Sequence, residues 1–318
     1  MIVLLLALSG AEGLLLQDVD ALRGAVERAL PLLEKTTAVT LNERSCFNCH
    51  NLGAPLLALK TARDRGFKVD PSNFKAVLEH TAESLKRTRE KFRQGKGGGG
   101  EADSAGWALW TLAEGGWAPD DTTSAAAHYL VVRDAAKGRW VNVSNRPPTE
   151  ASPFTTTFVA LAGLRAYLVA DEKEEAEARI AGALAWLRAA KPKDTEDRVF
   201  RLRALAYVGE KKDVEAAARD LVDLQRPDGG WGQLPDMESD AYATASALAA
   251  WGDVETPAYR KGLAWLLAAQ KPDGSWHVKS RSKPFQPYFE SGFPHAKDQF
   301  ISAHASSWAV VALALAVR

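Results

Sequence analysis

The chain has 318 residues, of which 46% are hydrophobic and 25% are charged. This is the composition of a folded globular protein with enough apolar material for a large core, and it argues against extensive disorder. Forty Lys and Arg residues balance forty Asp and Glu residues, so the formal net charge is zero. Because nucleic-acid binding needs a basic surface, we expect no nucleic-acid partner.

The chain begins with a short apolar segment, Met1 to Leu8, followed by the small residues Ser9 to Ala11. An apolar run followed by small residues is typical of a secretory signal peptide. We therefore expect residues 1–12 to be a signal peptide, residues 13–318 to form the folded domain, and the protein to be periplasmic or otherwise exported. The alternative is a helix start that packs on the core. No apolar stretch approaches the ~20 residues that cross a bilayer, so we expect no transmembrane span.

The two cysteines of the chain stand in the sequence Cys46-Phe-Asn-Cys49-His50. Two thioether bonds to haem vinyl groups need cysteines about one helical turn apart, and a histidine directly after the second cysteine becomes an axial iron ligand. The motif predicts one covalently attached haem c, bound by Cys46, Cys49 and His50. Two alternatives stay open: a disulfide within the pair, and part of a zinc site completed by His80 and an acid.

The sequence does not define the second axial ligand of such a haem. His295 is our candidate for the sixth ligand, and His304, His128 and Met237 are the other residues able to approach the iron. Each lone histidine is more often a hydrogen-bonded core or surface residue than a ligand. Five-coordinate iron is equally consistent with the motif.

The chain contains ten tryptophans, and several follow a glycine by two positions in a turn. The clearest units, residues 225–231 and 270–276, share a Gln-x-Pro-Asp-Gly-x-Trp pattern at a spacing of about 45 residues, which indicates stacked supersecondary units. Each unit predicts a leucine-rich helix, as at Thr256 to Gln270, a Pro-Gly turn and an Ala-rich helix, as at Ser239 to Trp251. We expect about twelve helices in about six hairpins, and helices that are apolar nearly all round favour a closed ring.

A longer pattern, running from Lys261-Gly262 through Trp265 and Gln270 to Trp276, resembles the QW motif of the squalene-hopene cyclase and oxidosqualene cyclase repeats. Residues 217–231 and 128–140 resemble degenerate copies. This resemblance implies an all-α (α/α)6 toroid, the fold shared with protein prenyltransferase β-subunits, with QW-type repeats over residues 103–318.

Three more stretches resemble a group of bacterial squalene-cyclase-like proteins that carry an N-terminal Cys-x-x-Cys-His motif. They are Arg146-Pro-Pro-Thr-Glu150, Ser239-Asp-Ala-Tyr-Ala-Thr244 and Tyr288-Phe-Glu-Ser-Gly-Phe-Pro294. This second resemblance extends the expected fold to the whole chain but supplies no activity.

Asp120-Asp121-Thr122 resembles part of the acid motif of class II terpenoid cyclases, Asp-x-Asp-Asp-Thr, in which a protonated carboxylic acid protonates an alkene. Ala118 stands in the place of the first acid. Asp120 and Asp121 are therefore candidate catalytic residues, but helix capping explains them better, since Asp240 recurs in register at another helix start. On this basis we expect no cyclisation of squalene.

The segment from Pro284 to Ser302 is rich in Phe, Tyr, Pro and His and is longer than an ordinary connection. Its aromatic residues could wall a haem or an apolar ligand, or could seal one end of the ring. They are Phe285, Tyr288, Phe289, Phe293 and Phe300.

Two function classes compete on this sequence. In the first, the protein is an exported toroid whose haem c serves electron transfer, redox sensing or haem-dependent chemistry with a redox partner protein. In the second, it is a terpenoid-cyclase-like enzyme or an isoprenoid-binding protein without haem, which holds an apolar small molecule in its centre. A third alternative is a protein-interaction scaffold, as repeat architectures often are.

Overall fold

The computed structural model describes residues 8–283 and 287–317, and the side chains from residue 19 onward. No strand occurs in these residues, which form α-helices joined by turns and short 3₁₀ or π segments. The α-helices are α1 (Leu8–Glu43), α2 (Ala54–Asp64), α3 (Pro71–Lys86), α4 (Arg89–Arg93), α5 (Glu101–Glu114), α6 (Asp121–Val132), α7 (Pro153–Tyr167), α8 (Lys173–Ala189), α9 (Thr195–Val208), α10 (Lys211–Val222), α11 (Ala241–Trp251), α12 (Pro257–Ala269) and α13 (Gln299–Ala316).

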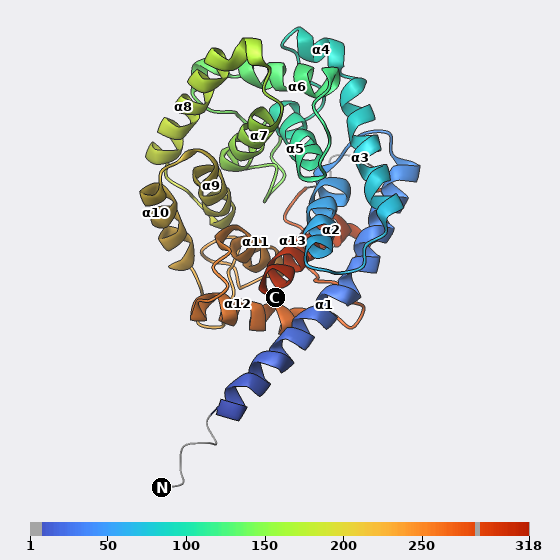
Figure 1. Cartoon of the computed structure of the whole chain (residues 1–318), viewed down its shortest axis with the longest axis vertical. Helices are drawn as coiled ribbons and strands as arrows, with labels where there is room; N and C mark the ends of the chain where they lie inside the picture. The colour runs from blue at the N-terminus through green and yellow to red at the C-terminus, as the bar shows by residue number, and fades with distance from the viewer. Residues whose placement is uncertain (1–7, 284–286, 318) are drawn as a thin grey trace.

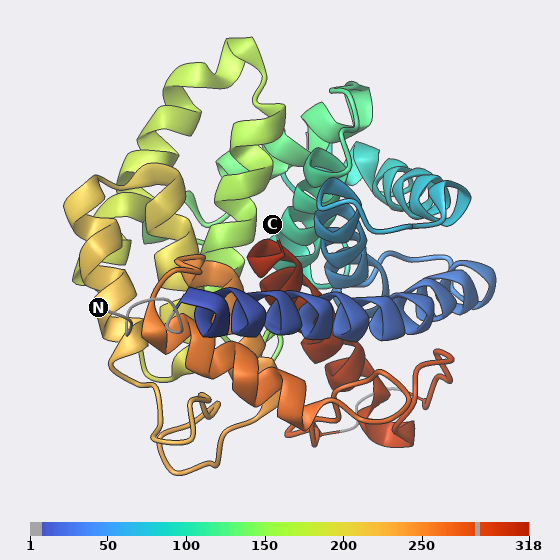
Figure 2. The ribbon, with the colours of Figure 1, turned by 60° about the horizontal axis from the view of Figure 1, so that its bottom comes forward.

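The helices form two concentric rings (Figure 1). The inner ring consists of α2, α5, α7, α9, α11 and α13, and each of these packs on the next until α13 meets α2. The outer ring consists of α1, α3, α6, α8, α10 and α12, with the short α4 beside α6. Figure 2 shows α1 lying across α12 and α13, which joins the two ends of the chain. The predicted all-α (α/α)6 toroid is confirmed.

The inner helices can approach one another closely because their side chains are small. Helices α11 and α13 are rich in Ala, Ser and Thr, and most of their side chains are buried against neighbouring helices on almost every face. Gly106 on α5 shows how tight this packing is, since a Cβ atom there would lie 2.7 Å from the backbone carbonyl carbon of Val159 on α7. Only glycine fits at that crossing.

The QW units lock neighbouring hairpins together. The Gln270 side-chain amide donates to the carbonyl of Gly274 in its own turn and to the carbonyl of Ala25 on α1. The indole of Trp276, which is fully buried, donates to the carbonyl of Leu266 at the end of α12. Gln225 and Trp231 repeat both interactions one unit earlier. These bonds give the buried amide and indole donors their partners and join each turn to the helix before it and to the next hairpin.

Some expectations differ from the structure at the chain ends. Of the expected signal peptide, residues 1–7 lie outside the described residues, and from Leu8 onward the chain belongs to α1. The segment Ala296–Ala316 is long and apolar enough to cross a membrane, which the sequence reading overlooked. It is an inner helix of the toroid, and 83% of its apolar window is buried there.

Candidate functional site

Polar side chains near the starts of the inner helices meet on one side of the ring centre. Helix amino termini carry positive partial charge, which favours acidic groups at such a position. We call this group the central cluster; it consists of Cys49, His50, Asp103, Glu150, Glu196, Tyr242 and His304.

Glu196 lies in the first turn of α9 and is 3% exposed. Its carboxyl group accepts hydrogen bonds from the hydroxyls of Tyr242, at 3.0 Å, and Thr155, at 2.8 Å. Burial raises the pKa of Glu196 to about 8, and the two hydroxyl bonds offset this only in part. Glu196 is therefore mainly protonated at neutral pH, the form that a general acid needs.

Asp103, in the first turn of α5, is a second buried acid of the cluster. It accepts a hydrogen bond from Thr156 on α7 at 3.2 Å. Burial raises the pKa of Asp103 to about 7, against the opposing effects of this bond and of the charge of Arg146. Asp103 and Glu196 thus lie on the two helices that flank α7. On α7, Thr156 donates to Asp103 and Thr155 donates to Glu196.

His304 on α13 lies among aromatic rings of the ring centre. Its ring centroid is 5.4 Å from that of Tyr242, 5.6 Å from that of Trp107 and 5.7 Å from that of Trp308. The residue is fully buried, and within the part of the chain that the structure describes neither of its ring nitrogens has a hydrogen-bond partner. This part of the centre therefore combines aromatic faces with one unsatisfied imidazole.

Cys49 and His50 open a short π-helix, Cys49–Gly53, that leads into α2. His50 Nε2 lies 3.0 Å from Oε1 of Glu150, and Cys49 Sγ lies 3.4 Å from His50 Nδ1 and 4.0 Å from the same carboxylate oxygen. Arg146 pairs with the other oxygen of Glu150. Burial, followed by the charge of Arg146, lowers the pKa of His50 to about 3, so this imidazole is neutral.

The environments of the two cysteines bear on the predicted haem. Cys46 is exposed, whereas Cys49 is buried and its sulfur contacts His50 and Glu150. A haem c needs both sulfurs on one porphyrin. In this conformation the side chains around His50 fit a single ion more closely than a porphyrin, and covalent haem stays a prediction.

The structure brings His304, and not His295, to the Cys-x-x-Cys-His motif. The ring neighbours of His50 are Phe300, at 5.4 Å, and His304, at 5.8 Å between centroids. His295 instead hydrogen-bonds to the hydroxyl of Ser275 and stacks on His277.

Two other candidate iron ligands lie away from the motif. His128 pairs with Glu172, and Met237 lies in a turn where its backbone bonds to Leu234. His80, the residue considered for a zinc site, lies beside the backbone of Cys46.

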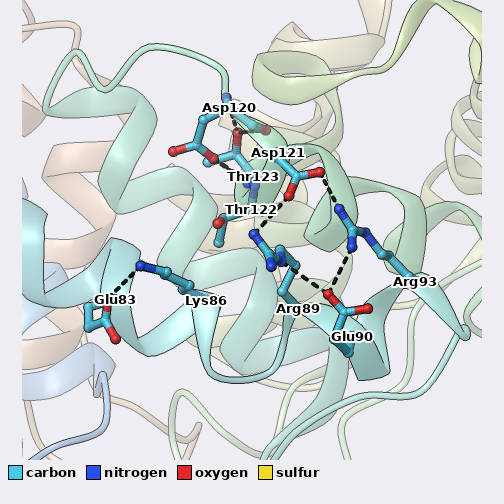
Figure 3. A network of polar contacts seen from close by, with 9 residues as sticks. All are labelled: Glu83, Lys86, Arg89, Glu90, Arg93, Asp120, Asp121, Thr122 and Thr123. Carbon is cyan, nitrogen blue, oxygen red and sulfur yellow. Dashed lines mark hydrogen bonds and ion pairs between the residues drawn. The ribbon is translucent and has the colours of Figure 1, made fainter.

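Asp120 and Asp121 are structural residues on the outer ring (Figure 3). Asp120 caps α6 by accepting the backbone amides of Thr122 and Thr123, and these bonds help to lower its pKa although burial alone would raise it. Asp121 pairs with Arg89 and Arg93 on α4. The expectation of helix capping is confirmed.

The sequence reading missed a second copy of the cyclase acid spacing. Asp194, Glu196 and Asp197 stand in the order acid-x-acid-acid, with glutamate in the middle position. Asp194 caps α9 by accepting the amide of Asp197, and Glu196 faces the centre. Accepting Glu for Asp in the motif would have revealed it. The missing first acid, one of the reasons for expecting no cyclisation of squalene, therefore does not apply to these residues.

The C-terminal aromatic segment divides into parts with different surroundings. Phe285 lies outside the described residues. Tyr288 is 61% exposed, Phe289 packs under the guanidinium of Arg44, and Phe293 is buried. Among the aromatic residues of this segment that the structure describes, Phe300 is the one whose ring lies against His50, and it walls the central cluster.

Comparisons with known proteins agree with this architecture. The family model of the squalene-hopene cyclase C-terminal domain matches residues 194–317, a stretch that starts at Asp194. A terpene cyclase-glycosyl transferase fusion protein, fsoA from Humicola fuscoatra, is 32% identical over 111 residues, which cover 30% of this chain and 8% of that protein. The chain thus spans a small part of this curated relative.

Solved structures share the fold over nearly the whole chain. A protein from Actinoplanes is 18% identical with a TM-score of 0.60, covering 93% of this chain and 100% of that one. The type II terpene cyclase MstE from Scytonema is 17% identical with a TM-score of 0.58, covering 93% and 98%. A variant of MstE in complex with geranylgeranyl dihydroxybenzoate has the same TM-score. This chain therefore shares the α/α toroid fold of these proteins.

Proposed function

We propose that this toroid is a terpenoid-cyclase-like enzyme that binds an isoprenoid-type apolar substrate in its aromatic centre and protonates it through Glu196. One observation carries the proposal: a carboxyl group buried at the start of an inner helix, whose hydrogen bonds within the described residues come from two hydroxyls, one of them that of Tyr242, whose ring belongs to the aromatic centre. The match of residues 194–317 to a cyclase domain and the complex of MstE with a geranylgeranyl compound support the substrate class.

The chemistry needs an acid and a surface that tolerates positive charge. Protonation of an alkene forms a carbocation, and aromatic faces stabilise a cation through their quadrupoles. Tyr242 links the two requirements, because its hydroxyl bonds Glu196 while its ring packs edge-on against His304. Thr149 holds the same hydroxyl at 2.8 Å and so fixes the position of the acid.

The test compares Glu196→Gln with the wild type on a panel of prenylated aromatic compounds, linear prenyl alcohols and squalene, with cyclic products detected by mass spectrometry. We expect cyclic product from the wild type and at least a ~100-fold loss in Glu196→Gln, since the amide cannot supply the proton. Asp120→Asn keeps a capping side chain and should retain activity. Equal product from wild type and Glu196→Gln would refute the role of Glu196.

We propose covalent haem c as the second candidate, because the Cys46-x-x-Cys49-His50 spacing is that of a haem attachment motif. It would make the toroid an exported electron-transfer or redox-sensing protein with a partner protein. Protein matured in a host with cytochrome c maturation should then show a Soret band that survives acid-acetone extraction, and a spectrum without such a band would refute it.

A further inference from the structure

Three donor atoms from two distant segments converge in the central cluster. A sulfur of Cys49, a ring nitrogen of His50 and a carboxylate oxygen of Glu150 all lie within 4.8 Å of one another. Thiolate, imidazole and carboxylate are the ligands that zinc takes in proteins, at ~2.0–2.3 Å from the ion, which places neighbouring ligand atoms about 3.5 Å apart. With Nε2 as the ring nitrogen, the spacings between the three donor atoms are 3.0, 3.7 and 4.0 Å, which bracket that value.

His304 provides a second and independent observation. This imidazole is fully buried, both of its nitrogens lack a hydrogen-bond partner among the described residues, and its ring lies 5.8 Å from the ring of His50. A buried polar group without a hydrogen-bond partner costs free energy. A polar group bound next to His50 would remove this cost.

We propose that Cys49, His50 and Glu150 hold one divalent metal ion of the zinc class, and that His304 faces its remaining coordination position. Three protein ligands with one free position are typical of catalytic rather than structural zinc sites. The free position would take a water molecule or the polar end of a ligand, with His304 as its hydrogen-bond partner.

The surroundings of the three residues suit such an ion. Arg146 pairs with Oε2 of Glu150, which leaves Oε1 directed at His50 and Cys49. Outer residues that orient a ligating carboxylate in this way strengthen metal sites. The thiolate of Cys49 and the carboxylate of Glu150 would balance the two positive charges of the ion. The buried acid Asp103 lies close enough to Cys49 and to Arg146 to interact with each electrostatically.

The two cysteines separate this proposal from covalent haem. Haem attachment uses both Cys46 and Cys49, whereas the metal site uses only the buried Cys49. The inference does not depend on the acid chemistry proposed for Glu196, because its test measures bound metal and not turnover.

The experiment titrates the chelator-treated full chain with Co²⁺, followed by competition with Zn²⁺. We expect one equivalent to bind with a thiolate-to-cobalt charge-transfer band and tetrahedral d–d absorption. Cys49→Ser should lose the charge-transfer band and weaken binding by at least about tenfold, since the thiolate is a direct ligand. Cys46→Ser is the matched control and should bind as the wild type does.

His304→Gln should keep the bound ion and the thiolate band while changing the d–d absorption, because it alters only the neighbour of the free position. Circular dichroism checks that each variant is folded. If the wild type shows no thiolate band, or if Cys46→Ser and Cys49→Ser lose binding equally, the proposal is wrong. An acid-stable Soret band in correctly matured protein would also overturn it in favour of haem.

Discussion

Asp120 and Glu196 both lie at the start of a helix, yet their pKa values shift in opposite directions. Asp120 accepts two backbone amides of its own helix and is open to water on the outer ring, so its charged form is stabilised. Glu196 points away from its helix into the centre, where two hydroxyls replace water. The neutral form of Glu196 is therefore favoured. Burial, rather than residue type, decides whether a carboxyl group at a helix start stays charged as a cap or stays protonated as an acid.

The raised pKa of Glu196 predicts how stability depends on pH. Folding raises this pKa from 4.5 to about 8, so the folded protein binds more protons than the unfolded chain between these values. The free energy of unfolding should therefore fall as pH rises through this window. Asp103, raised from 3.8 to about 7, adds an effect of the same sign.

Urea denaturation at a series of pH values checks this expectation. Glu196→Gln removes one titrating group and should flatten the decline between pH values of about 5 and 8. The infrared spectrum supplies a direct readout, since the carbonyl band of a protonated carboxylic acid should weaken in the variant. Identical pH slopes and identical spectra in both proteins would contradict a protonated Glu196.

At the scale of single residues, the sequence predicted the helix caps better than it predicted the residues of the central cluster. Asp120 and Asp240 could be recognised as caps because a cap depends on the few residues that follow it. Glu150 and His304 could not be placed beside Cys49, because their proximity depends on the closure of the whole ring. The acids at 194–197 were visible but carried no sign that their helix is an inner one.

At the scale of helices, the sequence correctly predicted those that belong to a repeated unit with a recognisable residue pattern. The predicted helix Thr256 to Gln270 is α12 with Thr256 and Gln270 as its caps, and Ser239 to Trp251 contains α11 with Asp240 as its cap. The short α4 and the π-helix Cys49–Gly53 have no such pattern and were not predicted. Periodicity identifies elements that repeat, and irregular elements near the site escape it.

Two glycines within helices predict substitutions of opposite sign. Gly106→Ala places a methyl group 2.7–2.8 Å from the backbone of α7, so overpacking should cost about 1–3 kcal/mol and exceed the ~1 kcal/mol gain in helix propensity. Gly182→Ala on α8 meets only Gly138, at 3.6 Å, which is ordinary contact. That substitution should stabilise by up to ~1 kcal/mol. Thermal unfolding of both variants checks this, and destabilisation of both to the same extent would contradict the close inner packing.

At the scale of the whole molecule, the toroid explains why the candidate site draws on nearly every hairpin. The segments that start the six inner helices each supply a residue to the central cluster or a partner of one, and the loop before α7 adds Glu150. No hairpin alone would bring an acid, a thiol and an imidazole together. The site therefore exists only when the ring is closed.

Closure depends on a contact between α1 and the last QW unit. Gln270 donates to the carbonyl of Ala25 at 2.8 Å, and Arg28 donates to the side-chain oxygen of Gln270 at 2.6 Å. Gln225 makes the equivalent amide bond to Ala258, also at 2.8 Å, between units that are consecutive in the chain. The two glutamines thus form a matched pair, one across the seam of the ring and one within it.

A closed ring predicts similar costs for Gln270→Ala and Gln225→Ala. Each substitution leaves a buried turn carbonyl, that of Gly274 or Gly229, without its donor and also removes the bond to the neighbouring hairpin. This should lower the free energy of unfolding by about 1–3 kcal/mol in urea denaturation. In a ring that unfolds cooperatively the seam is as necessary as any other joint, so both variants should shift the same single transition. In an open superhelix Gln270 would keep only its bond to Gly274, so Gln270→Ala would cost clearly less than Gln225→Ala. That difference would refute closure, and with it the assembly of the central cluster.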